Sequence, residues 1–190
     1  RQRQMCIRDR YYLMDKEAET VPIGANRLLY LPYLMGERTP HLDPNARGMF
    51  FGLSAIHTKK EMLRAVMEGV AYSLRDCVEI CREMDINVSD MMACGGGGTS
   101  PLWRQMLADL YNCPVKTASS KEGPALGVAI LALVGAGVYK TVPEACDKIV
   151  GVDKIQPPVA ENVPVYEKYF RLYDELYPAV KEKCAKLAKL

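Results

Sequence analysis

The chain lacks an excess of charge of one sign and lacks any apolar run long enough to cross a bilayer. Lysine and arginine together number 25, and aspartate and glutamate 23, among 190 residues with a formal net charge of +2. This balance argues against nucleic acid or a membrane surface as a partner. The longest apolar run, Ala125 to Val138, is interrupted by glycines and is shorter than the ~20 residues of a transmembrane helix. We expect it to form a buried helix.

Histidine is scarce, and cysteine follows no pattern of metal sites or disulfides. Only two histidines are present, and the seven cysteines are an odd number spread along the chain. No Cys/His spacing predicts a zinc site, and no Ser/His/Asp or Cys/His arrangement predicts a nucleophile. His41 is therefore interpreted as a loop residue and not as a ligand. Unpaired cysteines in apolar helical patterns are typical of a reduced, cytoplasmic protein.

The first residues differ from the rest of the chain. Residues 1–10, RQRQMCIRDR, are rich in arginine and show neither a hydrophobic period nor turn residues. We expect them to be an unrelated or artefactual leader and not a secretory signal. Residues 11–190 have a length that suits one domain with a single core.

The next part of the chain predicts a strand, a polar loop and a long helix. The apolar segment Arg27 to Leu34 indicates a buried strand, and Met35 to Arg47 indicates a loop because it contains glycine and prolines. Thr58 followed by Glu61 forms a capping box, the pattern that begins a helix. We therefore predict a helix from about Lys59 to Met84.

This predicted helix has two unlike faces. The apolar residues that recur at helical spacing are Met62, Val66, Val70, Leu74, Cys77, Val78, Cys81 and Met84. The charged residues of the opposite face are Arg64, Glu68, Arg75, Glu79 and Arg82. We expect the apolar face to be buried and the charged face to be solvated.

A strand, a glycine run and a helix then follow one another. The strand is predicted from Asp90 to Cys94 and runs into Gly95–Gly98, after which Ser100 and Pro101 are typical of a helix N-cap and first residue. Such a corner suits an anion, since glycines let a ligand approach the main chain and the first helical amides have no internal partner. A tight turn without a ligand is the alternative. A dinucleotide fingerprint lacks its third glycine here, and no Gly-Lys-Ser/Thr forms a P-loop.

The C-terminal part predicts further elements. We expect a strand from Pro114 to Ala118, a helix from Gly123, a short helix between Thr141 and Ile149, and a proline-rich connector from Gly151 to Pro164. The last helix should run from Tyr166 to Leu190. Its aromatic and aliphatic stripe is typical of packing and not of a cofactor site.

Two motifs resemble the FGGY carbohydrate kinases. The first fits their second signature through Gly48, Phe50, Gly52, Leu53, Glu61, Met62, Ala65, Val66, Met67 and Glu68. The second, GGGGTSPLWRQMLAD from Gly95 to Asp109, is similar to their adenosine motif, and GPALG from Gly123 follows it as in the family. The sequence ERTPH, Glu37 to His41, is most similar to the xylulokinases within the family. The chain is thus identified as resembling the C-terminal part of such a kinase.

The resemblance implies a fold and a set of site residues. It implies an α/β fold, the second lobe of an actin-like ATPase (ribonuclease H-like) with a mixed sheet flanked by helices, truncated at its N-terminus. ATP and Mg²⁺ would lie between two lobes, with the main chain of Gly95, Gly96 and Gly97 lining the ribose and inner phosphates. Ser100 would border adenine. Glu37 and Arg38 would belong to a loop on the substrate side.

For the loop, internal salt bridges of Glu37, Arg38 and Arg47 are the alternative to a substrate role. For Arg47 this alternative is favoured over a ligand contact.

The resemblance also implies a reaction, transfer of the ATP γ-phosphate to D-xylulose to give D-xylulose 5-phosphate. The catalytic base, an aspartate in the family, would come from the missing N-terminal lobe, so no catalytic or metal-binding residue is assigned here. We expect the chain alone to be inactive, and a homodimer is possible. The alternatives are another family member, such as a gluconokinase, ribulokinase or glycerol kinase, and a nonenzymatic actin-like module that binds nucleotide.

Overall fold

The computed structural model describes residues 2–95, 97–119 and 123–190, of which residues 2–10 are described through their backbone only. Its elements in chain order are α1 (Gln2–Glu19), β1 (Leu29–Leu31), β2 (Met49–Phe51), α2 (Lys59–Glu83), β3 (Met91–Ala93), the 3₁₀ turn η1 (Gly97–Thr99), α3 (Pro101–Tyr111), β4 (Val115–Ala118), α4 (Gly123–Gly135), α5 (Val142–Ile149), β5 (Val152–Gln156) and α6 (Val163–Leu187). Residues 2–10, predicted to be a separate leader, are thus continuous with α1. Their origin stays a prediction.

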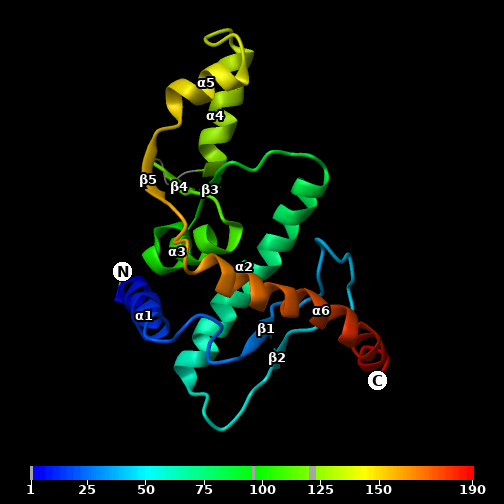
Figure 1. The fold of residues 1–190 in the computed structure, drawn as a ribbon. Helices are drawn as coiled ribbons and strands as arrows, with labels where there is room; N and C mark the ends of the chain where they lie inside the picture. The colour runs from blue at the N-terminus through cyan, green and yellow to red at the C-terminus, as the bar shows by residue number, and fades with distance from the viewer. Residues whose placement is uncertain (1, 96, 120–122) are drawn as a thin grey trace.

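Helix α2 is the centre of the molecule, and α1, α3, α6 and β1 pack against it (Figure 1). It begins where the sequence predicts: the Thr58 hydroxyl accepts a hydrogen bond from the Lys60 N–H, and a Glu61 carboxylate oxygen accepts one from the Thr58 N–H at 2.8 Å. These bonds satisfy amides that have no partner within the helix. The predicted capping box is confirmed.

The strands form two small sheets. β1 pairs antiparallel with β2, with Leu29 opposite Phe51. In the second sheet the order is β3-β4-β5, where β3 runs parallel to β4 and β5 runs antiparallel to it. The predicted mixed sheet is confirmed. The connector predicted over Gly151–Pro164 is wrong in part, because β5 lies within it. This strand is largely exposed and contains charged residues, so its sequence lacks the hydrophobic alternation that predicts a strand. It is a strand because its backbone pairs with β4.

The main core lies among α2, α3, α6 and β1. Tyr72 of α2 is fully buried, and its ring centroid lies 5.2 Å from that of Tyr173 and 6.3 Å from that of Phe170. Tyr166 and Tyr177 are buried on the same face of α6. Aromatic rings at these separations add to the free energy gained by burial of their area. The predicted packing role of the stripe is confirmed.

The predicted orientation of α2 is wrong for most of the helix, although Val78 of the predicted apolar face is buried. Arg64 is only 5% exposed and Glu68 1%, whereas Met62 and Val66 of the predicted buried face are exposed. The buried charges satisfy each other: Arg64 Nε donates to Glu68 Oε1 at 2.7 Å, and both carboxylate oxygens of Glu68 accept from the Gly24 N–H at 3.1 Å. Burial of ions is tolerated when they are paired and hydrogen-bonded in this way.

A small residue on α2 lets β1 approach closely. A Cβ atom on Gly69 would lie 2.1 Å from the carbonyl oxygen of Tyr30, which is closer than any side chain permits. The strand therefore packs directly against the backbone of the helix. Periodicity of large apolar residues does not reveal such a face.

Helices α4 and α5 pack on each other and project from the rest of the molecule (Figure 1). The expectation that residues 125–138 form a buried helix is wrong for this chain. Ile130 is buried, but Val128 is 68% exposed and Leu131 60%. The helix forms as predicted, and among the described elements α5 packs against it. None of the helices within the described ranges has the length and apolarity of a membrane span.

Candidate functional site

The glycine turn, residues 95–100, joins β3 to α3. Gly95 has φ 76°, and a Cβ atom there would meet nothing within 4 Å. Gly98 is buried, and a Cβ atom there would lie 2.9 Å from the Ala93 carbonyl oxygen. Glycine is thus needed at position 95 for conformation and at position 98 for close packing. Gly97 lies exposed in η1, and Gly96 lies outside the described residues.

Ser100 is the N-cap of α3, as predicted. Its Oγ accepts a hydrogen bond from the Trp103 N–H at 3.1 Å, and Pro101 is the first helical residue. The cap satisfies one first-turn amide. The helix presents its positive end to the glycine turn, an arrangement that favours negative charge.

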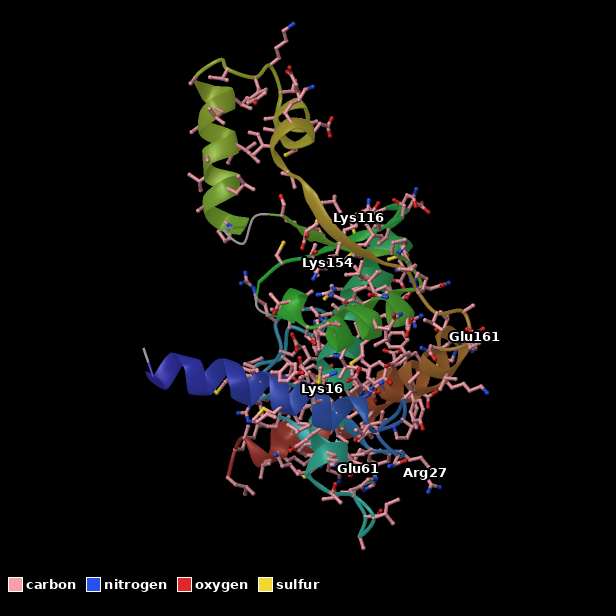
Figure 2. All side chains as sticks on the ribbon, turned by 90° about the vertical axis from the view of Figure 1, so that its left-hand side faces the viewer. Lys16, Arg27, Glu61, Lys116, Lys154 and Glu161 are labelled. Atoms are coloured by element: carbon pink, nitrogen blue, oxygen red, sulfur yellow. The ribbon has the colours of Figure 1, made fainter. Side chains whose placement is uncertain are left out.

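Beneath this turn lies an arginine that sequence reasoning missed. Arg104 is buried, and its Nη1 donates to the Gly98 carbonyl oxygen at 2.6 Å. The signal that could have found it is the one cationic residue of a largely apolar helix, one turn after the N-cap. Lys116, on the neighbouring strand β4, is by contrast paired with Asp90 at 3.0 Å. Figure 2 labels Lys116 and, on β5, Lys154.

The polar loop, residues 36–47, is held by its own backbone. The N–H of Glu37 donates to the Asp43 carbonyl at 2.9 Å, and the N–H of Asp43 donates to the Glu37 carbonyl at 2.8 Å. The Glu37 carboxylate accepts from the N–H groups of Arg38 and Thr39. Arg38 is exposed. Glu37, which is half-buried, therefore shapes the loop, and Arg38 is the more exposed member of the predicted pair.

Arg47 holds the loop as predicted, although not through a salt bridge. Its Nη1 donates to the carbonyl oxygens of Pro44 at 2.9 Å and Ala46 at 2.7 Å. These bonds close the end of the polar loop.

Aromatic residues of α6 and of the segment that follows β1 pack against the polar loop. The ring of His41 stacks on Tyr177 with centroids 3.9 Å apart, and Tyr33 Oη lies 3.1 Å from His41 Nε2. Burial lowers the pKa of His41. The hydroxyl of Tyr177 donates to Asp43 Oδ2, and this bond lowers the pKa of that carboxyl group. His41 is thus a loop residue as predicted, with a packing role.

The same region contains an unforeseen carboxyl group. Asp76 of α2 is buried, and its Oδ2 has no hydrogen-bond partner. Burial, with the nearby charge of Asp174 as the next cause, raises its pKa to about 7. Such a group is a candidate for a functional or a structural role.

The two predicted parts of the site are separate in this chain. The glycine turn lies between β3 and α3, whereas the polar loop lies against α6 (Figure 1). Within the described ranges no three His, Cys, Asp or Glu residues are grouped to hold a metal ion. The described residues can therefore offer a surface for an anionic ligand and a shaped loop, and no group of three metal ligands is assembled among them.

Comparison with known proteins agrees with these motifs. Residues 3–136 match the model of the FGGY family of carbohydrate kinases, C-terminal domain. The chain is similar to the xylulose kinase of Staphylococcus epidermidis, with 42% identity over 170 residues that cover 90% of this chain and 34% of that protein. The chain thus spans about a third of the length of the curated relatives that it matches.

Solved structures give the same result for the fold. The ligand-bound xylulose kinase of Lactobacillus acidophilus superposes with a TM-score of 0.86 at 33% identity, covering 92% of this chain and 35% of that one. The gluconate kinase of the same organism gives a TM-score of 0.85, also at 33% identity and with the same coverage. The chain is thus about equally similar to a structure named as a xylulose kinase and to one named as a gluconate kinase.

Proposed function

Since the chain belongs to the FGGY family of carbohydrate kinases and corresponds to its C-terminal domain, we propose that it is the nucleotide-side lobe of a xylulokinase-like sugar kinase. Its α/β fold with a mixed sheet and flanking helices is that of the actin-like ATPase lobe of these kinases, as predicted. The xylulokinase assignment is supported by the ERTPH sequence of the polar loop and by the 42% identity to a xylulose kinase.

The proposed reaction transfers the γ-phosphate of ATP to D-xylulose and gives D-xylulose 5-phosphate. Phosphoryl transfer depends mainly on positioning and on stabilisation of charge, so the catalytic groups must converge on one cleft. This chain covers about a third of its relatives, and we propose that the base, an aspartate, lies in the remainder of the protein. Closure of the two lobes would then assemble the site and exclude water. The chain alone should be inactive.

The glycine turn is the proposed nucleotide site. The main chain of Gly95, Gly96 and Gly97 would face the ribose and inner phosphates, and the open space beside Gly95 supports this role. Ser100 would border adenine through contact, because its hydroxyl already accepts the cap hydrogen bond. In the described ranges no three His, Cys, Asp or Glu residues are grouped as metal ligands. Mg²⁺ bound with a nucleotide needs only one or two carboxylates besides the phosphates, and we propose that the remainder of the protein provides them.

The polar loop is the proposed substrate-side element. Glu37 would act by shaping the loop through its hydrogen bonds to the backbone. Arg38 would face the cleft, because its side chain is the exposed one of the two. Gluconate is the alternative substrate, favoured by the equal identity of the gluconate kinase structure. A ranking of kcat/KM for xylulose, ribulose, gluconate and glycerol in the complete protein decides between them. A nonenzymatic nucleotide-binding module would show no turnover in that assay. We also propose a cytoplasmic location, which the use of ATP and the free cysteines of the described residues support. Formation of a homodimer stays a prediction.

A matched pair of glycine variants tests the nucleotide site. Gly95 and Gly137 both have φ 76°, and neither has an atom within 4 Å of an added Cβ. Gly95→Asp should abolish ADP binding measured by calorimetry, because a carboxylate would occupy the phosphate side of the turn. Gly137→Asp, between α4 and α5, carries the same backbone strain and should leave affinity unchanged. Equal ADP affinities of the two variants would show that the glycine turn is not part of the nucleotide site.

A further inference from the structure

The feature that carries a further inference is the buried guanidinium of Arg104. This side chain is 5% exposed and lies one turn into α3. Its Nη1 donates to the carbonyl oxygen of Gly98 at 2.6 Å, and its buried Nε has no hydrogen-bond partner. Among the described residues, the guanidinium therefore donates to the glycine turn and to no other group.

Arg104 differs from the other buried arginines in its charge balance. Arg64 is paired with Glu68 at 2.7 Å, and Arg75 with Glu79 at 3.0 Å and with Glu167 at 2.6 Å. No carboxylate lies within ion-pair distance of Arg104 in the part of the chain that the structure describes. A buried cation without a counterion is costly, and this cost falls when an anion binds close by.

The contact also fixes the shape of the turn. A peptide unit is planar, so holding the Gly98 carbonyl against a buried cation sets the orientation of the whole unit between Gly98 and Thr99. Gly98 also packs closely on the end of β3, since a Cβ atom there would lie 2.9 Å from the Ala93 carbonyl oxygen. Arg104 thus holds the inner side of the turn and leaves the outer side, at Gly95 and Gly97, exposed.

We propose that Arg104 is a positioning residue for a nucleoside di- or triphosphate: it fixes the glycine turn and supplies the positive charge that the ligand's phosphates balance. This inference rests on the proposed function. Because the charge is buried, solvent and salt screen it weakly, and it acts on phosphates at the turn without touching them. It should therefore favour ADP over adenosine, which has the same base and ribose but no charge.

Two substitutions separate the charge from the hydrogen bond. Arg104→Gln removes the charge and keeps an N–H donor, whereas Arg104→Lys keeps the charge and loses the planar fork. Arg82→Gln is the control for loss of an arginine–carbonyl bond away from the turn, at a half-buried arginine that is paired with Glu79 at 2.7 Å. That arginine also donates to a backbone carbonyl, that of Tyr111, at the opposite end of α3. Calorimetric titrations with ADP and with adenosine, on the whole 190-residue chain, give the affinities.

The expected result is that R104Q weakens ADP binding about tenfold or more and adenosine binding less than threefold. R104K should keep the preference of the parent for ADP, and R82Q should bind both ligands as the parent does. An equal loss for ADP and adenosine would mean a structural role only and would overturn the proposal, as would unchanged ADP affinity in R104Q.

Two controls keep the outcomes distinct. If the parent chain binds no ADP, the nucleotide site itself fails and this inference fails with it; if the parent binds ADP and R104Q does so equally, only the inference fails. Thermal melting shows whether R104Q folds. If R104Q does not fold, the R104K variant tests the proposal. A role based on charge requires R104K to keep the preference for ADP over adenosine, and loss of that preference overturns the proposal.

Discussion

Asp76 shows how a single buried carboxyl group can make stability depend on pH. Its Oδ2 has no hydrogen-bond partner, and burial raises its pKa to about 7 from 3.8. Asp174 and Glu37 raise the pKa further, whereas Arg75 opposes them. Because the folded pKa is the higher one, folding favours the protonated form. The associated stability is complete below about pH 4 and is lost as the pH rises through about 7.

We therefore predict that Asp76→Asn stabilises the chain at pH 8 and not at pH 4. The amide fills the same space without charge, and removal of an unsatisfied buried charge is worth ~1–3 kcal/mol. Urea unfolding at both pH values measures the effect. Asp153→Asn, at an exposed position on β5, is the control and should change neither value. A gain for D76N of equal size at both pH values would contradict the assigned cause.

At the scale of the element, two helical glycines allow the effect of packing on stability to be distinguished from the effect of helix propensity. Gly69 of α2 faces the Tyr30 carbonyl, which an added Cβ would approach to 2.1 Å, whereas Gly127 of α4 has nothing within 4 Å. Both are interior helical positions. Intrinsic propensity alone predicts a gain for alanine at either one.

We predict opposite signs for the two substitutions. Gly69→Ala should destabilise the chain by ~1–3 kcal/mol, because strand β1 must move away from the helix. Gly127→Ala should stabilise it by ~0.5–1 kcal/mol, since only backbone entropy changes. Free energies of unfolding from denaturant titration test both. Stabilisation by G69A would show that β1 does not pack on α2 as described.

The N-cap of α3 gives a prediction of its own. Ser100→Ala removes the acceptor for the Trp103 N–H and should cost ~1 kcal/mol of stability. Ser100→Asp keeps an acceptor and should recover that stability. Denaturant unfolding gives these values. Calorimetry with ADP on S100A then shows whether the serine also serves the proposed nucleotide site, because a cap role alone predicts unchanged affinity at a temperature where the variant is folded.

At the scale of the whole molecule, exposed apolar surface indicates a covering partner. Val128 and Leu131 of α4 are exposed, and the chain spans about a third of its relatives. Exposed apolar groups gathered on one helix mark a surface that associates with other protein. We propose that the remainder of the same protein covers α4.

We predict that Leu131→Lys acts differently in the two contexts. In the 190-residue chain it should reduce self-association, measured by sedimentation, and leave the melting temperature unchanged. In the complete protein it should lower stability by ~1.5–3 kcal/mol, the value of a buried leucine side chain. Leu190→Lys, at the fully exposed chain end, is the control. No loss of stability in the complete protein would mean that α4 stays exposed there.

Local chemistry in the sequence was sufficient for much of the fold. The caps at Thr58 and Ser100 place the starts of α2 and α3, since they depend on side chains within three residues of the amides that they satisfy. The aromatic period of α6 identifies its buried face, because large apolar rings gain most from leaving water. The glycine run locates the predicted turn between strand and helix.

Other features were decided only by the tertiary structure. The buried face of α2 is the one with Arg64 and Glu68, because partners distant in sequence, Gly24 and Tyr166, satisfy those charges. The exposure of α4 depends on which segments are available to cover it. The environment of Arg104 depends on how the turn folds back over α3. Sequence patterns record whether a side chain is polar, whereas burial of a polar group depends on whether a distant partner reaches it.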